Sequence, residues 1–424
     1  MVGGSSTINA CFWLRGSEAD YDGWAALGNP GWSATDLAPY FRRSESDPLI
    51  GPRHGVNGPV PVYRATRDEF TTIDEAFVAA SEAIGLPYAE DLNQDAIQRP
   101  SVGPMPKNIR DGVRMNGAFT YLAPARSRLN LRIEPGALVD RVIIRGRRAT
   151  GVRLADGRVV EAGEVILCAG AYGSPAILLR SGVGPADHLA ALRIPVTLDL
   201  PAVGSHLLDH PFIRPPSLTP WTIKPQYARN ETAFVQVALK ARSRSRPSEI
   251  DLHIYPTQRF DPDRGAWVFR LSVSLQDARS SGRLRLISPD PAAPPAIDHR
   301  YLSHPGDVDA LSDGVDLALQ LVAEPALAEV LLGDSGFKPD WRDRNAMKRW
   351  IRAEVGTTFH PSGTCAMGPA TEAGAVVDAR GRVHGLEGVR VADASIFPTN
   401  LRANLHCTVV AVAEKLADAV CAGA

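Results

Sequence analysis

A short apolar run that leads through a glycine turn into the start of a helix is the feature that most constrains how this chain can fold. Residues 165–168 (Val-Ile-Leu-Cys) have the composition of a buried strand, and residues 169–173 (Ala-Gly-Ala-Tyr-Gly) follow as a turn. The next residues predict a helix with Ser174 as N-cap, Pro175 at its first position and Gly182 just past its end. A strand that feeds a helix in this way is an α/β element, and the helix N-terminus favours negative charge. We therefore expect an α/β fold, with α+β character in part of the chain.

A second structural unit is indicated between about residues 216 and 358, where the pattern changes. Strand-like runs at 233–239, 249–255 and 266–275 predict an antiparallel sheet. Apolar residues at helical spacing then predict a helix from about 308 to 323. We expect this unit to be inserted between two parts of the α/β unit.

The α/β unit itself is predicted from both sides of that insertion. Before it, residues 139–168 are typical of a β-meander. After it, residues 389–391 predict a short strand that ends near Asp393, and an apolar stripe predicts a closing helix at about 408–420.

Composition excludes several classes of partner. The 424 residues carry a formal net charge of -1, which argues against nucleic acid as the main partner. No apolar run is long enough to span a membrane, and no leader for export is recognisable. An odd number of scattered cysteines favours free thiols and a cytoplasmic location over a disulfide framework. The five are Cys11, Cys168, Cys365, Cys407 and Cys421.

Two histidines near the end of the chain are the strongest candidates for chemistry. His360 lies among loop-forming residues, and His406 lies where a loop gives way to the closing helix. Imidazole is the side chain best suited to move a proton near neutral pH. If the two converge, one can take the proton of a hydroxyl while the other holds its oxygen. Loop histidines are often structural, however, so each alone is weak evidence of function.

Other chemistries find little support in the sequence. His206 and His210 have the spacing of two ligands on one helix face, but no glutamate lies between them and no third ligand is evident. We therefore expect no metal site. The sequence contains no G-x-S-x-G elbow, no phosphate-binding G-x-x-x-x-G-K-[ST] and no G-x-G-x-x-G.

Several segments, in order, resemble the glucose–methanol–choline (GMC) family of flavin-dependent alcohol oxidoreductases. The first signature is similar to residues 2–24, the second to residues 170–185, and the base-bearing motif to residues 360–368. Further family blocks match residues 203–211, 281–286 and 298–302. The resemblance extends from Met1 to about Val420.

The resemblance implies a fold and a domain order. It implies a GMC-like FAD-binding domain with a Rossmann-type sheet, joined to a substrate domain built on an antiparallel sheet with helices. The expected boundaries are 1–215 for the first part of the FAD-binding domain, 216–369 for the substrate domain and 370–424 for the return. Residues 60–103 are expected to pack with the substrate domain.

The resemblance also implies site residues and a cofactor. His360 matches the general base and His406 is placed at the second catalytic position, so the implied reaction is oxidation of an alcohol to an aldehyde or ketone with hydride transfer to FAD. The implied electron acceptor is oxygen or a quinone-type molecule. Ile8 stands where some members carry a histidine bound covalently to FAD, which implies non-covalent FAD. The implied cofactor-binding residues are Gly3, Gly4, Ser5, Ser6, Asn9, Val139 and Asp393.

One departure from the family pattern leads to a further expectation. Family members begin with a strand–G-x-G-x-x-G–helix unit, and this sequence does not contain that motif. We therefore expect the N-terminal dinucleotide-binding unit to be lacking and the parallel sheet to be incomplete, as in a truncated chain or one with a mis-assigned start. Two alternatives to an alcohol oxidoreductase stay open: a non-catalytic fragment of such an enzyme, and an FAD-containing hydroxynitrile lyase.

Overall fold

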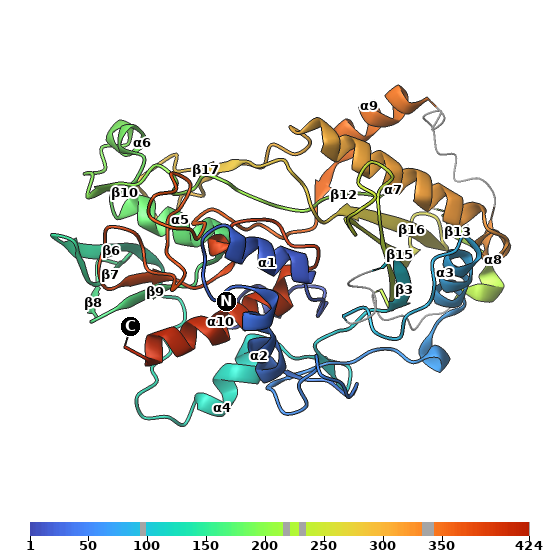
Figure 1. The fold of residues 1–424 in the computed structure, drawn as a ribbon, viewed down its shortest axis with the longest axis horizontal. Coiled ribbons are helices and arrows are strands. Elements are labelled where there is room, and N and C mark those ends of the chain that lie inside the picture. Colours follow the sequence, from blue (N-terminus) through green and yellow to red (C-terminus); the bar gives the residue numbers. More distant parts are fainter. Residues whose placement is uncertain (94–98, 215–220, 229–234, 333–342, 424) are drawn as a thin grey trace.

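The computed structural model describes residues 1–93, 99–214, 221–228, 235–332 and 343–423. Its elements form two parts that lie side by side (Figure 1). Helices and short strands gather around α10 (Leu405–Cys421) in one part, where the marked chain ends also lie. The other part is a larger sheet, on which α3 (Thr72–Ala83), α7 (Pro305–Ala323) and α8 (Pro325–Val330) pack. Each part has its own cluster of buried apolar side chains.

The first part contains the predicted α/β element. β9 (Val165–Leu167) pairs in parallel with β21 (Val389–Val391), which joins two segments far apart in the chain. α5 (Gly170–Arg180) follows β9, and α10 (Leu405–Cys421) packs against α2 (Ala34–Ser44). The α/β prediction is thus confirmed.

The predicted meander is correct in its first three strands and wrong in its last. β6 (Val139–Arg145), β7 (Arg148–Leu154) and β8 (Val159–Glu161) form an antiparallel sheet. The expected fourth strand, β9, leaves this sheet for β21 because Val165 and Leu167 are buried beside Val389 and Val391 in the core of the first part.

The helix after β9 begins earlier than its sequence indicates. It starts at Gly170, whose φ of 76° suits glycine, so Ser174 and Pro175 lie inside the helix instead of at its start. Pro175 has no N–H to give to the carbonyl of Ala171, one helical turn earlier. The Thr364 hydroxyl donates to that carbonyl at 2.6 Å, so the oxygen stays satisfied and the proline is tolerated.

The second part is built on an antiparallel sheet of eight strands among the described residues, as predicted. Its strand order is β19-β13-β16-β15-β14-β3, with β12 beside β16 and β20 beside β12. Their bounds are β3 (Ser101–Pro104), β12 (Pro211–Ile213), β13 (Trp221–Ile223), β14 (Val237–Ala241), β15 (Leu252–Asp261), β16 (Ala266–Leu275), β19 (Leu331–Leu332) and β20 (Gly356–Thr357). Residues 233 and 234 of the first predicted strand lie outside the described ranges.

Alternation along β16 separates the two faces of this sheet. Phe269, Leu271 and Val273 are fully buried and pack with the apolar face of α7 (Pro305–Ala323). Gly314 permits that contact, because a Cβ there would lie 2.5 Å from Val273 Cγ1. The side chains between these apolar residues are polar and point to the opposite face.

The remaining elements connect and cover these two parts. The further helices are α1 (Glu18–Ala26), α3 (Thr72–Ala83), α4 (Ala123–Ala125), α6 (Ala186–Ala191), α8 (Pro325–Val330) and α9 (Arg344–Glu354). The further strands are β1 (Glu45–Ser46), β2 (Val60–Pro61), β4 (Ile109–Arg110), β5 (Val113–Arg114), β10 (Val183–Gly184), β11 (Leu198–Asp199), β17 (Arg283–Arg285) and β18 (Ala296–Asp298). No helix in the described ranges has the length and apolar character that crossing a membrane requires.

The domain boundaries stay a prediction, although one detail of the fold agrees with them. α3 and β3 both come from the segment 60–103 and both contribute to the second apolar cluster. All five cysteines are free, as the sequence favours.

Candidate functional site

His360 lies in an irregular loop directly after β20. Its backbone N–H donates to Asp209 Oδ1 at 2.9 Å, and Leu208 and Ser362 exchange two backbone hydrogen bonds of 3.0 Å. The preceding residue, Phe359, has a φ of 62° and an 82% exposed side chain, so the chain turns sharply there. The loop is therefore fixed to the segment that leads into β12.

Three side chains surround the His360 imidazole. Asn404 Nδ2 lies 3.1 Å from His360 Nε2, while Thr358 Oγ1 and His210 Nδ1 each lie 2.9 Å from His360 Nδ1. An amide NH₂ can only donate, so Nε2 is the acceptor in the first contact. The Thr358 hydroxyl donates to the His210 carbonyl at 3.0 Å, so its oxygen is free to accept from His360 Nδ1–H. These contacts favour the tautomer whose Nε2 carries a lone pair.

Burial keeps this imidazole neutral. Desolvation lowers the pKa of His360 to about 4, although the nearby Asp209 carboxylate opposes the change. A neutral ring with a lone pair on Nε2 is the form that accepts a proton from a substrate.

His406 lies in the first turn of α10 and makes different contacts. Its ring stands perpendicular to that of Trp13 at a centroid distance of 5.1 Å, and its Nδ1 atom is buried without a hydrogen-bond partner among the described residues. Burial lowers the pKa of His406 to about 4, and the positive charge of Arg114 acts in the same direction. Among the described residues, His406 is not one of the hydrogen-bond partners of the His360 ring, which are His210, Thr358 and Asn404.

Asn404 is a candidate that sequence reasoning missed. An asparagine just before a helix is usually explained as an N-cap. Here Asn404 occupies that position but makes no side-chain cap, because its amide is turned to His360. The available signal in the sequence was its place two residues before the candidate His406, where the loop leads into the closing helix.

We expect the two buried histidines to make the protein less stable in acid. Their pKa of about 4 in the folded state lies below the ordinary histidine pKa of 6.5, so the unfolded chain binds more protons between these values. The contribution of His360 and His406 to the free energy of unfolding should be fully present above pH 6.5 and should be lost as the pH is lowered towards 4. Urea unfolding at a series of pH values measures this, and His406→Gln should make the dependence on pH shallower. If the free energy of unfolding of His406→Gln depended on pH as steeply as that of the wild type, the assignment of this effect to His406 would be contradicted.

The predicted flavin loop forms a tight turn at the start of the chain. Gly3 has a φ of 93°, and a Cβ there would lie 2.6 Å from Thr7 Oγ1, so only glycine fits. Ser6 Oγ donates to Gly3 O at 2.5 Å and accepts from Gly117 N at 3.0 Å. Gly4 and Ser5 are exposed, and Asn9 is held by Arg114.

The two other predicted cofactor residues lie at strand ends in the first part. Asp393 follows β21, and its Oδ2 atom accepts from Gly170 N at 2.8 Å and from Ser174 Oγ at 2.5 Å. The carboxylate therefore binds the N-terminal turn of α5. Val139 begins β6, where its carbonyl accepts from Arg180.

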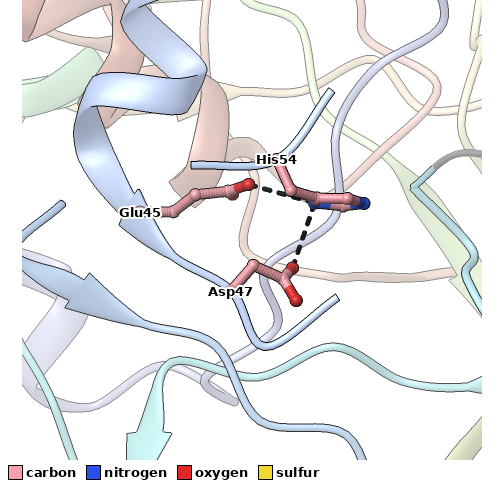
Figure 2. Close-up of side chains that lie close together, drawn as sticks. All are labelled: Glu45, Asp47 and His54. Carbon is pink, nitrogen blue, oxygen red and sulfur yellow. Dashed lines mark hydrogen bonds and ion pairs between the residues drawn. The ribbon is translucent and has the colours of Figure 1, made fainter. Parts of the chain in front are cut away.

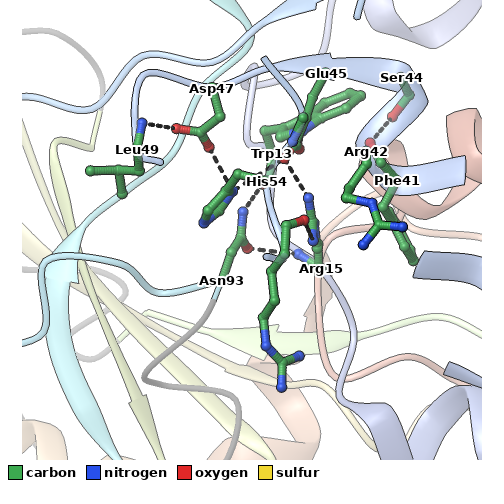
Figure 3. Close-up of polar contacts among 12 residues, drawn as sticks. Trp13, Arg15, Phe41, Arg42, Ser44, Glu45, Asp47, Leu49, His54 and Asn93 are labelled. Atoms are coloured by element: carbon green, nitrogen blue, oxygen red, sulfur yellow. Dashed lines mark hydrogen bonds and ion pairs between the residues drawn. The ribbon is translucent and has the colours of Figure 1, made fainter. Parts of the chain in front are cut away.

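Trp13 also contacts a buried ion cluster. Trp13 Nε1 donates to Glu45 Oε2 at 2.8 Å, and Arg15 pairs with the other oxygen of the same carboxylate. Figure 3 shows these side chains converging with His54 and Asn93. The cluster thus ties the segment that carries Trp13 to the end of α2.

The cluster is balanced in charge. His54 bonds Glu45, Asp47 and Asp91, while Arg64 pairs with Asp47 at 2.7 Å and with Asp91 at 2.9 Å. Burial alone would lower the pKa of His54, but its bonds to these three carboxylates raise it to about 11. With Arg15, the cluster contains three positive and three negative groups.

The same cluster contains the group of described side chains that most resembles a metal site. Ligand-type atoms of Glu45, Asp47 and His54 lie within 4.8 Å of one another (Figure 2). Because Arg15, Arg64 and the protonated His54 already neutralise these carboxylates, the group is accounted for as ion pairs. His206 and His210, whose spacing in the sequence resembles that of two metal ligands, have different partners. His206 Nε2 makes a hydrogen bond with the Pro398 carbonyl, whereas His210 contacts His360.

Family comparison decides what kind of protein carries this site. The N-terminal GMC oxidoreductase family model matches residues 1–212, and the C-terminal GMC oxidoreductase model matches residues 278–413. The chain belongs to the GMC oxidoreductase family. GMC enzymes use FAD, and a flavin-dependent oxidation of alcohols is supported at the level of the family.

Relatives and solved structures agree with this membership. The chain is 36% identical to "Oxygen-dependent choline dehydrogenase 1" of Chromohalobacter salexigens, over 99% of this chain and 80% of that protein. Its fold matches pyridoxine 4-oxidase from Mesorbium loti with a TM-score of 0.86 and 29% identity, over 98% of this chain and 82% of that one. An FAD-dependent oxidoreductase from Chaetomium thermophilum matches with a TM-score of 0.86 and 25% identity, over 100% of this chain and 86% of that one.

The expectation that the GMC N-terminal unit is lacking is wrong, because the N-terminal family model matches from residue 1 to residue 212. The G-x-G-x-x-G motif marks one strand-to-helix turn. Its absence from the sequence therefore said little about the rest of the N-terminal domain, which β9, α5 and the first loop help to form.

Two observations show that the residues present fit FAD. In the first loop, a Cβ on Gly4 would meet nothing within 4 Å, so this glycine leaves room for a flat ring to approach the backbone closely. At α10 the N-cap side chain does not satisfy the first-turn N–H groups, and the buried His406 Nδ1 has no hydrogen-bond partner in the part of the chain that the structure describes. These groups can bind the polar edge of a flavin, and the partial positive charge of the helix N-terminus favours negative charge there.

Proposed function

We propose that this GMC oxidoreductase oxidises the CH–OH group of a small alcohol to an aldehyde or ketone, with His360 as the general base. The observation that carries the proposal is the pairing of His360 Nε2 with Asn404 Nδ2 at 3.1 Å. One atom is a proton acceptor and the other is a hydrogen-bond donor, and a hydroxyl group needs both.

The substrate hydroxyl replaces this direct contact. Its hydrogen points to His360 Nε2 while its oxygen accepts from Asn404 Nδ2, so the proton leaves for His360 as the carbonyl forms. His360 Nδ1 keeps its proton through Thr358 and His210, which holds the ring in the required tautomer. When bound, FAD supplies the acceptor for the hydride that leaves carbon. Oxygen or a quinone-type molecule is the proposed final electron acceptor.

His406 keeps its predicted place as a second catalytic residue within this proposal. Its unpartnered Nδ1 atom and its position in the first turn of α10 suit a contact with the cofactor or the developing alkoxide. The cofactor-binding residues Gly3, Gly4, Ser5, Ser6, Asn9, Val139 and Asp393, and the domain boundaries, are part of the same proposal. A cytoplasmic location is proposed from the unpaired cysteines.

Separate substitutions of Asn404 and His406 should distinguish a residue that binds only the substrate hydroxyl from one that also contacts the cofactor. We expect Asn404→Ala to lower kcat/KM about tenfold, the worth of one lost hydrogen bond, with FAD content unchanged. We expect His406→Ala to lower flavin content as well as turnover. Steady-state kinetics together with flavin-to-protein ratios measure both. If Asn404→Ala had no effect on kcat/KM, the contact between Asn404 and His360 would play no part in catalysis.

Product analysis tests the proposed reaction against its alternatives. A hydroxynitrile lyase releases cyanide from mandelonitrile and does not need an electron acceptor, whereas an alcohol oxidoreductase consumes one equivalent of acceptor for each carbonyl formed. Carbonyl formation from mandelonitrile without acceptor consumption would favour the lyase. A purified chain that binds no FAD would favour the non-catalytic fragment.

A further inference from the structure

The polar face of the large sheet carries a group of arginines. In the β15–β16 ladder, Thr257 lies opposite Arg270 and Arg259 lies opposite Val268, so Arg259 and Arg270 project to one face. Arg214, just beyond β12, donates from Nε to Ser272 Oγ at 3.3 Å and so shares that face. The opposite face carries the apolar residues that pack on α7.

This face is continuous with the candidate active site. His210, which bonds His360 at 2.9 Å, lies one residue before β12, and residues 210, 212 and 214 alternate to the same side. The Arg214 guanidinium lies over the Phe212 ring at 4.8 Å, so it leans back along the strand towards His210. The two Cα atoms are about 13 Å apart in an extended strand, and this lean brings the charge closer to His360.

A second contact connects this face to the predicted flavin loop. Tyr255, two residues before Thr257 on β15, has its ring edge-on to Phe12 at a centroid distance of 6.0 Å. Phe12 follows the glycine-rich loop by a few residues. Arg214 lies near enough to Tyr255 to influence its pKa. The arginines therefore face the region that the proposed reaction uses.

The positive charge on this face is poorly compensated. Within the described ranges, Arg214, Arg259 and Arg270 make no ion pair, and Arg270 Nε is buried without a hydrogen-bond partner. The acidic residue beside them, Asp261, pairs with Arg264 at 3.7 Å. Burial lowers the pKa of Arg270, and the charges of Arg259 and Arg214 lower it further. Like charges this close are unfavourable unless an anion joins them.

We propose that the alcohol substrate carries an oxyanion, a carboxylate or phosphate, that binds Arg214 and Arg270 while its CH–OH group lies at His360. This inference rests on the proposed function. Guanidinium groups bind such oxyanions through paired hydrogen bonds, and Arg270 Nε offers a buried donor for one. The same charges would repel a quaternary ammonium substrate, so this chain should differ from the relatives that are named for choline.

Matched substrates test the inference directly. Linear ω-hydroxycarboxylates with roughly four to eight carbons span the distances that the strand allows, and 1-alkanols of equal length are neutral controls. We expect kcat/KM for the best hydroxycarboxylate to exceed that of its alkanol about tenfold or more, with choline poorest. Equal values for hydroxycarboxylates, alkanols and choline would overturn the inference and leave the proposed alcohol oxidation intact.

Variants assign the preference to the two arginines. Arg214→Gln and Arg270→Gln should each remove most of the preference for the hydroxycarboxylate over the alkanol of equal length. Arg214→Glu should shift the preference towards choline, and we expect the variant to fold because Arg214 is exposed. Arg158→Gln removes an arginine that pairs with Asp156 in the turn between β7 and β8, and this matched control should behave as the wild type. An unchanged preference in both glutamine variants would overturn the assignment.

A binding measurement separates this inference from the proposed reaction. Hexanoate has no hydroxyl group and cannot be oxidised at a CH–OH centre, so its binding to the holoenzyme, measured by calorimetry against hexanamide, reports on the anion site alone. Binding that depends on Arg214 supports the site, and equal binding of hexanoate and hexanamide overturns it. Arginine-dependent binding in an enzyme whose flavin no alcohol reduces would contradict only the proposed function.

Discussion

His360→Ala should lower the turnover of alcohol by about 10²–10⁴-fold, because the variant loses its general base. The loss should appear in kcat and in kcat/KM together, since the proton moves only as the reaction proceeds. Stopped-flow reduction of the flavin by a saturating alcohol measures the affected step without interference from reoxidation.

The controls for this prediction address folding and cofactor content. The variant should keep its flavin-to-protein ratio, because His360 is held by Asp209, Thr358 and His210 and is not one of the residues proposed to bind FAD. His188→Gln removes a histidine on α6, away from the site, and should retain full turnover. Near-normal flavin reduction in His360→Ala would show that another group takes the proton.

Glu45→Ala should cause the largest loss of stability among single substitutions in the ion cluster. The Glu45 side chain is fully buried, and its removal leaves Arg15 and the protonated His54 without one of their compensating charges and Trp13 Nε1 without its acceptor. Breaking a buried ion pair from one side typically costs about 3–5 kcal/mol. Equilibrium unfolding in urea measures the loss.

Two comparison variants show whether the loss of stability in Glu45→Ala comes from the lost charge or from the lost packing. Glu45→Gln keeps an acceptor for Trp13 but not the negative charge, so it should recover only part of the stability. Glu387→Gln removes a carboxylate from the exposed pair with Arg148 and should change stability very little. If Glu45→Ala were as stable as Glu387→Gln, the cluster would not hold the N-terminal segment in place.

The contribution of His54 to the free energy of unfolding should also depend on pH. It should decrease as the pH rises, whereas the contribution of His360 and His406 decreases as the pH falls. The pKa of His54 is about 11 in the folded protein, above the ordinary histidine pKa of 6.5. Its contribution is therefore fully present below pH 6.5 and is lost as the pH rises towards 11. The two effects should together place maximal stability near pH 6.5, with a fall towards acid and towards alkaline pH.

Local patterns predicted the elements of the fold well where the periodicity was strong. The stripe at 308–323 and the alternating run at 266–275 correspond closely to α7 and β16, because each buries one regular face. The start of α5 could not be predicted in the same way. Ser174 and Pro175 have the residue types of a helix start, and only the distant Thr364 and Asp393 make their interior positions favourable.

The candidate site shows the same division between local and distant information. His360 was recognisable from its own neighbours in the sequence, but its contacts with His210 and Asn404 join segments that no local pattern connects. The arginines of the sheet face are likewise brought together by strand pairing. Sequence patterns thus identified the chemistry of single residues, and the fold supplied the combinations.

Anaerobic mixing of the flavin-loaded chain with an alcohol substrate tests the central claim most directly. If the chain oxidises a CH–OH group with hydride transfer, the visible absorbance of the oxidised flavin should bleach, one equivalent of aldehyde or ketone should form for each flavin, and His360→Ala should slow both. A flavin that stays oxidised with neutral, anionic and cationic alcohols alike, in a protein that binds FAD and is folded, would contradict the account.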